Sequence, residues 1–186
     1  MNPVDELAAL FAGEGGAEYL GEAVTQAGHM LQAGALAEAA GAPAPLVAAA
    51  LLHDIGHFHG TVTGRDLMEG HQDNRHSHTG ADRLARWFGP EVAEPVRPHV
   101  AAKRYLCAVE PGYFAPLSEA SVHTLRVQGG PMMVEQARAF AELPGAADAV
   151  AVRRWAEQAK DPGLATPDFD HFRPLLASLL LERRTP

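Results

Sequence analysis

Apolar residues recur every three to four positions along most of this chain, and short clusters of proline and glycine separate these stretches. The spacing is typical of amphipathic helices, and no stretch alternates apolar and polar residues as a half-buried strand would. Asn2, Pro3 and the acidic residues after them predict a helix start. The predicted helices cover residues 3–11, 21–40, 46–54, 75–88, 118–127, 134–143, 146–159 and 169–181, with a kinked helix through Pro95 and Pro98 that ends near Tyr105.

The stretch from Leu46 to Asp54 is apolar around almost its whole circumference, which predicts a helix in the centre of the core. Its last two residues, His53 and Asp54, are therefore expected to lie in the interior. Residues 56–74 contain four glycines and show no periodicity. We expect a loop there, long enough to serve as a lid.

Length and composition also indicate an all-α fold. The 186 residues suit one domain, residues 1–186, that buries a sizeable core. Of these residues 47% are hydrophobic, largely alanine and leucine, which favour helices. A single helical bundle is the expected architecture.

The formal net charge of −8 argues against binding to nucleic acid or to an anionic membrane, because both require a basic surface. A local basic pocket for a small anion is compatible with this charge. Cys107 is the only cysteine, which excludes an intrachain disulfide, and neither a signal-peptide pattern nor an apolar run of 18 residues is present. We therefore expect a cytoplasmic protein, and the sequence leaves its oligomeric state open.

Histidines and aspartates recur in an order that indicates a metal centre. The candidate ligands, in chain order, are His29, His53, Asp54, His76, His99 and Asp161. One carboxylate can bridge two cations, and imidazole with carboxylate but no thiolate suits iron, manganese and other first-row metals. Four neutral imidazoles and two carboxylates carry a total charge of only −2. A centre that holds two divalent ions therefore stays positively charged and should attract an anionic substrate.

Three histidines compete for the middle position of this series. His76 stands four residues before Gly80-Ala81, so it shares a helix face with small residues that let a neighbouring helix come close. His78 points about 200° away from His76 at ~100° per residue, and His71 falls in the loop. We therefore select His76 and expect the other two to be solvated.

Lys103 lies four residues after His99 and so on the same helix face. A permanent cation beside a positive metal cluster is unfavourable unless an anion regularly lies between them. Ser121, Thr124 and Arg153 could complete an oxyanion clamp around such an anion. The alternative is that Lys103 extends to solvent.

The order His, His-Asp, His, His, Asp resembles the HD-domain superfamily of all-helical, metal-dependent phosphohydrolases and oxygenases, whose dinuclear branch has the two additional histidines. Longer segments resemble a narrower family, the HD-domain phosphonate oxygenases. The matching segments, which lie between residues 18 and 165, are Tyr19-Leu20-Gly21-Glu22, His53 to His57, His99 to Leu106, Ser118 to Ser121, Gln128-Gly129-Gly130 and Arg153 to Pro162. His59 and the polar loop through His71 do not match clearly, so the lid is expected to differ.

This resemblance implies a mixed-valent Fe(II)/Fe(III) pair, with O2 as co-substrate. One iron would be held by His29, His53, Asp54 and Asp161, and the other by Asp54, His76 and His99. Tyr19 and Glu22 would lie at the entrance, with Glu22 at the amino end of the substrate. The phosphonate would be held by Lys103, Ser121, Thr124 and Arg153. Gln128 would also line the substrate site, and His57 would act beside Lys103 near the substrate oxygen.

The reaction implied is O2-dependent cleavage of the C–P bond of a 1-hydroxy-2-aminoethylphosphonate or its N-methylated analogue, giving phosphate and glycine or glycine betaine. The strongest alternative is an HD phosphohydrolase for a nucleotide or phosphomonoester, because the same ligands can generate a metal hydroxide that attacks phosphorus. A non-catalytic metal-binding helical module is the third interpretation.

Overall fold

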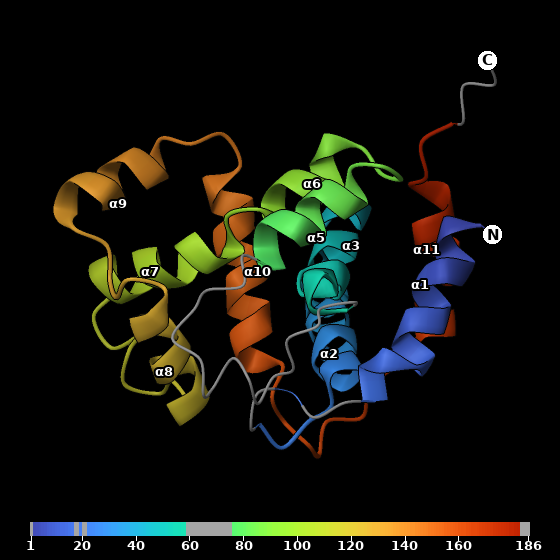
Figure 1. Cartoon of the computed structure of the whole chain (residues 1–186), viewed down its shortest axis with the longest axis horizontal. Coiled ribbons are helices and arrows are strands. Elements are labelled where there is room, and N and C mark those ends of the chain that lie inside the picture. The colour runs from blue at the N-terminus through green and yellow to red at the C-terminus, as the bar shows by residue number, and fades with distance from the viewer. Residues whose placement is uncertain (1, 17–18, 20–21, 59–75, 183–186) are drawn as a thin grey trace.

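The computed structural model describes residues 2–16, 19, 22–58 and 76–182, and these residues form helices and connecting turns (Figure 1). An isolated antiparallel β-bridge joins Phe88 and Leu180. The α-helices are α1 (Pro3–Ala12), α2 (Gln26–Ala39), α3 (Ala44–Leu52), α5 (His76–Leu84), α6 (Pro90–Val96), α7 (His99–Val109), α8 (Glu119–Val127), α9 (Val134–Ala141), α10 (Ala146–Gln158) and α11 (Phe169–Ser178). Two short 3-10 turns, η1 (Glu14–Gly16) and η2 (Ile55–His57), complete the elements. The all-α prediction is confirmed.

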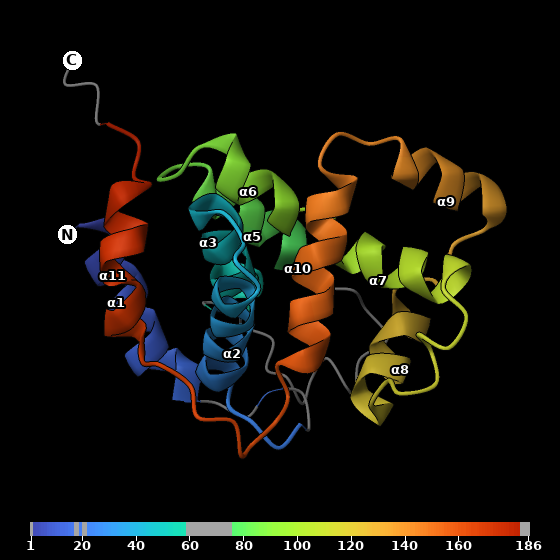
Figure 2. The same cartoon turned by 180° about the vertical axis from the view of Figure 1, so that it is seen from behind.

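Helix α3 lies at the centre of the largest apolar cluster, as its sequence predicted. All of its residues from 46 to 52 are buried, and the helix packs against α2, α6, α10 and α11. Helices α1 and α11 lie side by side at one end of the molecule (Figures 1 and 2). Their apolar faces add Phe11, Phe169 and Phe172 to this cluster.

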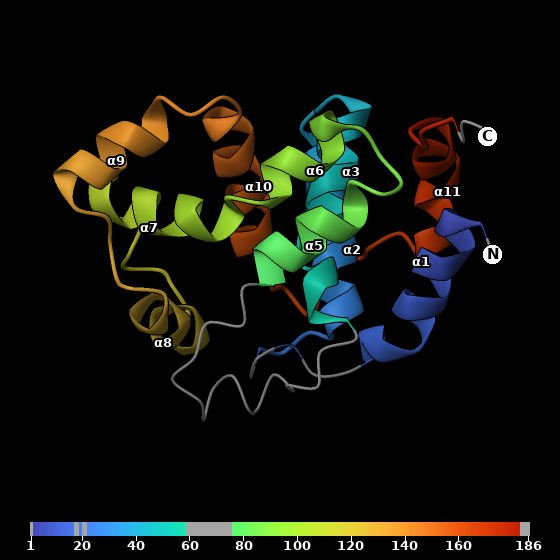
Figure 3. The same ribbon diagram turned by 45° about the horizontal axis from the view of Figure 1, so that its top comes forward.

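The opposite end of the molecule is built around α7 and has two smaller apolar clusters. Helix α9 packs against α7, and α10 runs between α7 and α2 (Figure 3). One small cluster is centred on Ala102 and Phe140, and the other on Leu106 and Leu125. Helix α10 therefore connects the large cluster to the smaller ones.

Several helix boundaries differ from the prediction for local reasons. The helix expected from residue 21 begins at Gln26, because the Thr25 side chain accepts a hydrogen bond from Gly28 N and caps the first turn. The helix expected over residues 75–88 ends at Leu84 and continues as turns. The kinked helix is in fact two helices, because Pro98 lacks the N–H that would continue α6, and α7 restarts at His99.

The end of α3 also differs. The helix stops at Leu52 and not at Asp54, whose φ of −103° and ψ of 13° lie outside the helical region. The chain then turns through η2 to Phe58, and the rest of the loop expected over residues 56–74 lies outside the described residues. None of the described helices is long and apolar enough to cross a membrane.

Candidate metal centre

Four histidines and one aspartate meet in the interior, each at the end or in the first half of a helix. His29 comes from α2, His53 and Asp54 from the turn after α3, His76 from the first residue of α5 and His99 from the first residue of α7. Each of the five is at most 8% exposed. The sequence predicted this grouping, and the structure brings all five together.

The two carboxylate oxygens of Asp54 face two different pairs of histidines. Oδ2 lies 3.6 Å from His29 Nε2 and 3.5 Å from His53 Nε2. Oδ1 lies 3.4 Å from Nε2 of both His76 and His99. The five side chains therefore form two adjacent subsites that share one carboxylate, which is the arrangement of a bridging ligand.

The imidazole rings of three of these histidines are oriented by main-chain carbonyls. Nδ1 of His29 lies 2.8 Å from Ala159 O, that of His53 2.8 Å from Ala50 O, and that of His99 2.7 Å from Val96 O. A carbonyl only accepts, so each Nδ1 carries the proton, and Nε2 presents a lone pair to the centre.

The paired Nε2 atoms are only 3.0 Å apart for His29 and His53, and 3.2 Å apart for His76 and His99. In the first pair both Nε2 atoms are acceptors, and two lone pairs at this distance repel each other unless a cation lies between them. Burial lowers the pKa of His29 well below its usual value, that of His53 to about 4 and that of His76 to about 3. The rings are therefore neutral near pH 7, as metal ligation requires.

Asp54 stays ionised in this centre. Burial alone would raise the pKa of its carboxyl group, but the interactions with His53, His76 and His99 outweigh burial and hold the pKa well below its usual value. A carboxylate among four imidazoles without thiolates fits first-row transition metals. The donor set thus fits two metal ions, each with two histidines and one oxygen of Asp54.

Asp161 is not brought to this cluster in the same way. Its side chain is exposed, and its Oδ1 accepts a hydrogen bond from Gly163 N at 2.8 Å. Its main chain, in contrast, is fixed next to the centre, because the Gln32 side chain accepts from Asp161 N and donates to Asp161 O. A role for Asp161 as a ligand stays a prediction, and it would require the carboxylate to turn inward.

The predicted residues around the centre are found close to it. His57 stacks on His76 with ring centroids 4.1 Å apart, and it can share a metal ion with Asp54 and His76. Tyr19 stacks on His29, with centroids 3.9 Å apart and planes inclined by 14°. Burial raises the pKa of Tyr19, and the charge of Asp54 adds to this effect. His78 is exposed, as predicted, whereas His71 lies outside the described residues.

A group of cations lies beside the metal centre. Lys103 is 4% exposed, so it does not extend to solvent, and its Nζ donates to Thr124 Oγ1 at 2.9 Å. Arg153 is 7% exposed and donates to Tyr113 OH and to Glu157. Burial, and then the charges of Arg153 and a second lysine, Lys160, lower the pKa of Lys103 well below its usual value.

Lys160 is the main residue that the sequence analysis missed. Its Nζ donates to Ser121 Oγ at 2.7 Å and pairs with Glu157 Oε1 at 2.8 Å and with Glu22 Oε1 at 3.2 Å. Burial, and then the charge of Arg153, lower its pKa to about 8. A signal existed in the sequence, because Lys160 is one of only two lysines among 15 basic residues and directly precedes Asp161.

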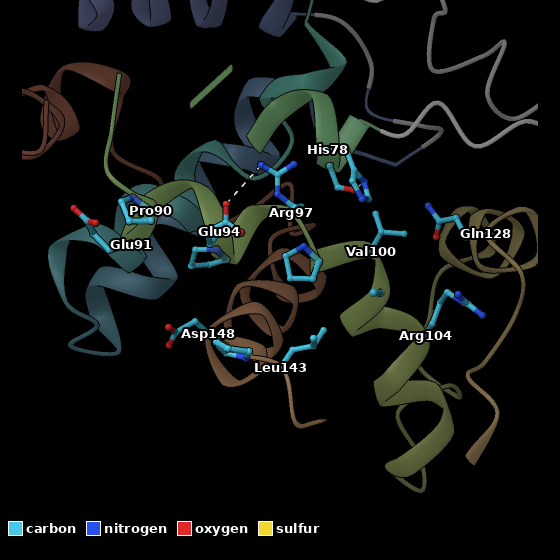
Figure 4. Close-up of a pocket in the computed structure, with 16 residues that line it drawn as sticks. His78, Pro90, Glu91, Glu94, Arg97, Val100, Arg104, Gln128, Leu143 and Asp148 are labelled. Carbon is cyan, nitrogen blue, oxygen red and sulfur yellow. Dashed lines mark hydrogen bonds and ion pairs between the residues drawn. The ribbon is translucent and has the colours of Figure 1, made fainter. Parts of the chain in front are cut away.

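Gln128 lines a pocket of about 710 Å³ between α5, α6, α7 and the start of α10. Figure 4 shows Gln128 and Arg104 on one side of this pocket and Glu91 and Asp148 on the other. Gln128 Oε1 is buried and has no hydrogen-bond partner among the described residues. Its predicted contact with substrate stays a prediction.

Comparison with known proteins agrees with this geometry. The sequence profile of the HD domain matches residues 27–128. The [1-hydroxy-2-(trimethylamino)ethyl]phosphonate dioxygenase (glycine-betaine-forming) of Leisingera caerulea is 44% identical over 179 residues, covering 96% of this chain and 91% of that protein. The hydroxymethylphosphonate dioxygenase of Gimesia maris is 40% identical over 173 residues, covering 89% and 82%. An uncharacterized protein of Acanthamoeba polyphaga mimivirus is 33% identical over 180 residues, covering 96% and 82%.

Proposed function

This chain belongs to the HD-domain family and, within it, to the family of the phosphonate dioxygenases, and from this premise we propose that it uses O2 to cleave the C–P bond of a small hydroxyphosphonate. The two relatives with a named activity are dioxygenases and not hydrolases, so the phosphohydrolase and non-catalytic alternatives are not retained. The observation that carries the proposal is the shared carboxylate of Asp54 between two pairs of histidines, with buried cations beside it.

The substrate we propose is a 1-hydroxy-2-aminoethylphosphonate or its N-trimethylated analogue. The second form has the support of the 44% identical relative, which is named for a trimethylamino substrate. The C–P bond breaks, C1 is oxidised to a carboxylate and O2 is reduced, so that one O2 gives one phosphate and one glycine or glycine betaine. The cofactor we propose is two iron ions in the Fe(II)/Fe(III) state, which supply the redox chemistry that O2 requires.

The protein's own residues bind and orient the substrate in this proposal. Lys103 and Arg153 supply positive charge for the phosphonate, with the hydroxyl groups of Ser121 and Thr124 as further hydrogen-bond partners. Glu22 supplies the negative charge for the amino end. Because Lys103, Ser121 and Arg153 are each at most 7% exposed, these interactions take place away from bulk water and are correspondingly strong.

Two aromatic side chains stand next to the ligands. We propose that His57, which stacks on His76, hydrogen-bonds the substrate oxygen at the second subsite. Tyr19, stacked on His29, covers the first subsite, so we propose that it moves when substrate binds. A cytoplasmic location, a single domain and the lack of nucleic-acid binding stay predictions from the sequence.

The test is anaerobic loading with iron followed by addition of the hydroxyphosphonate and O2. We expect an EPR signal of a coupled Fe(II)/Fe(III) pair that shifts when the substrate is added, and phosphate release that depends on O2. Lys103→Met should lose most of this release, whereas His171→Ala, at an exposed position on α11, should keep it. Equal phosphate release without O2 would contradict the proposal.

A further inference from the structure

Lys160 is a largely buried cation to which the reaction above gives no role. It lies two residues beyond the end of α10, and its side chain is 13% exposed. Its Nζ contacts Ser121 Oγ on α8, Glu157 Oε1 on α10 and Glu22 Oε1 in the segment before α2. One ammonium group therefore holds together three parts of the chain that surround the proposed substrate site.

The partners of Lys160 belong to both ends of that site. Ser121 is one of the residues proposed to bind the phosphonate, and Glu22 is the carboxylate proposed to bind the amino end. Lys160 Nζ lies 2.7 Å from the Ser121 hydroxyl and 3.2 Å from the Glu22 carboxylate. The ammonium group of Lys160 can thus bind a phosphonate next to Ser121. At Glu22 it competes with the amino group of the substrate for the same carboxylate.

The charges of Glu22 and Lys160 favour an exchange in which each leaves the other and pairs with the opposite charge on the substrate. The Glu22 and Lys160 side chains are each 13% exposed, so leaving either charge without its partner is costly. A substrate with only a phosphonate would draw Lys160 away and leave Glu22 with less compensation. A zwitterionic substrate would supply an anion for Lys160 and a cation for Glu22 in the same step.

A hydrogen bond that Glu22 accepts from a second donor makes this exchange possible for a trimethylammonium group. Such a group has no N–H and cannot donate, unlike the ammonium of Lys160. Glu22 Oε1 also accepts from Ser118 Oγ, whose own contact with Lys160 Nζ is long at 3.5 Å. The carboxylate therefore keeps a donor while the substrate supplies only charge.

We propose that Lys160 is a specificity-determining residue that pairs with Glu22 in this structure, transfers to the phosphonate when substrate binds, and so favours substrates that carry both a cation and an anion. This inference rests on the proposed function, since it concerns the same site. It adds a third cation to Lys103 and Arg153 and selects zwitterionic phosphonates over hydroxymethylphosphonate, the substrate for which one of the relatives is named.

Binding of two unreactive analogues tests the exchange. 2-(Trimethylamino)ethylphosphonate and ethylphosphonate both lack the C1 hydroxyl group, so the metal-loaded full chain can be titrated with them in a calorimeter without turnover. We expect the zwitterionic analogue to bind the unmodified chain at least about tenfold more tightly, a difference of about 1.4 kcal/mol. Lys160→Met should weaken both analogues by about tenfold.

The diagnostic result is the coupling between the two residues. Glu22→Gln should weaken the zwitterionic analogue yet strengthen ethylphosphonate several-fold, because Lys160 then keeps only Glu157 as a carboxylate partner and moves to the phosphonate at a lower cost. In a chain that carries Lys160→Met, Glu22→Gln should give ethylphosphonate no such gain. Lys160→Gln, which keeps a donor for Ser121, serves as a second variant, and iron content with thermal unfolding shows that each variant is folded and loaded.

Arg154→Met is the matched control, because Arg154 lies on α10, six residues before Lys160, is exposed and pairs with Glu110. It should change neither affinity. If Lys160→Met and Lys160→Gln leave both affinities unchanged, Lys160 only links the three segments and the inference is overturned. Since O2-dependent phosphate release by the unmodified chain is measured separately, that result would leave the proposed function standing.

Discussion

At the scale of single residues, Asp54 is the side chain on which the centre depends most. Its two oxygens serve different pairs of histidines, so each histidine belongs to one subsite whereas Asp54 belongs to both. The position of the residue favours this role, because the chain leaves the helical conformation at Asp54, just after the buried residues 46–52 of α3. The carboxylate is therefore held in the interior with both oxygens facing the histidines.

Replacing Asp54 should remove both metal ions. We expect Asp54→Ala to lose nearly all bound iron, because each subsite loses its anionic ligand, whereas His99→Ala should keep the ion held by His29 and His53. Metal analysis of protein loaded with iron and then desalted gives the stoichiometry. One tightly held ion in Asp54→Ala would show that the carboxylate does not bridge.

The buried histidines also make the stability of the metal-free chain depend on pH. An unfolded histidine titrates near 6.5, but in the fold the pKa of His53 is about 4 and that of His76 about 3. The unfolded chain thus takes up protons first as the pH falls, so stability should be lost between about pH 6.5 and pH 4, by roughly 3 kcal/mol for His53 alone.

Urea unfolding of the metal-free chain at pH 7, 6, 5 and 4 measures this effect. The free energy of unfolding should fall across the series, and it should fall less in His53→Gln, which has no proton to gain at that position. A stability that stays flat from pH 7 to pH 4 would contradict neutral, buried histidines.

Sequence reasoning reached the five residues of the cluster because their spacing and order are local signals. It did not reach Lys160 or Gln32, since their roles depend on which segments α10 approaches. Asp161 is the opposite case, a residue that the sequence predicted at the centre and whose side chain the structure leaves outside it. Its place in the motif predicted a ligand, but the turn after α10 leaves its side chain exposed and fixes only its main chain.

At the scale of elements, the approach of α5 to η2 places His76. An added Cβ at Gly56 would lie 2.0 Å from His76 O and 2.9 Å from Gly80 N. Gly80, in turn, lies against Gly56 and Ile55. The sequence predicted a close neighbour at the small residues one turn after His76. These residues contact η2, and this contact holds the start of α5 at the metal centre.

Gly56→Ala should therefore push α5 away from η2. Backbone atoms cannot move aside like a flexible side chain, so we expect a loss of roughly 1–3 kcal/mol in stability and weaker binding at the subsite of His76 and His99. Thermal unfolding and iron stoichiometry measure the two effects.

Gly16→Ala is the matched control, because an added Cβ there meets no atom within 4 Å. It should leave both quantities unchanged. If Gly56→Ala binds two ions with unchanged stability, the contact between η2 and α5 does not position His76.

Some helix ends were predictable from a cap or a proline, and others were not. Helix α1 was predicted from Asn2 and Pro3, and the Asn2 side chain does accept from Val4 N. The break between α6 and α7 was read as a kink, because apolar spacing continues across Pro98. The difference matters for function, since the break makes His99 the first residue of α7.

At the scale of the whole molecule, the metal ligands come from segments that are far apart in the sequence but adjacent in the fold. Helices α2 and α3 belong to the large apolar cluster, whereas α7 leads into the smaller clusters at the other end. Metal ions bound by His29, His53, His76 and His99 would link these parts. An unfolded chain does not assemble such ligands, so metal binding should stabilise the fold.

Metal loading should raise the melting temperature, by an amount equivalent to about 2.7 kcal/mol for each ion at a free concentration 100 times its dissociation constant. Scanning calorimetry with and without a chelator measures this increment.

The fully buried Phe172 lies in the large cluster on α11. Phe172→Ala should lower stability by about 3–5 kcal/mol with and without metal alike, whereas Asp54→Ala should abolish the increment. An equal increment in Asp54→Ala would contradict the linkage.

The three main-chain carbonyls that orient His29, His53 and His99 have a consequence for how this centre can change. Every residue type brings the same carbonyl oxygen, so substitutions at Ala50, Val96 and Ala159 cannot remove the hydrogen bonds themselves. All three positions are fully buried, and only side chains of suitable volume fit there. Substitutions at these positions are thus limited by the volume of the side chain and not by its chemical type. The residues that line the substrate pocket can therefore change toward new phosphonates while the imidazole rings keep their orientation.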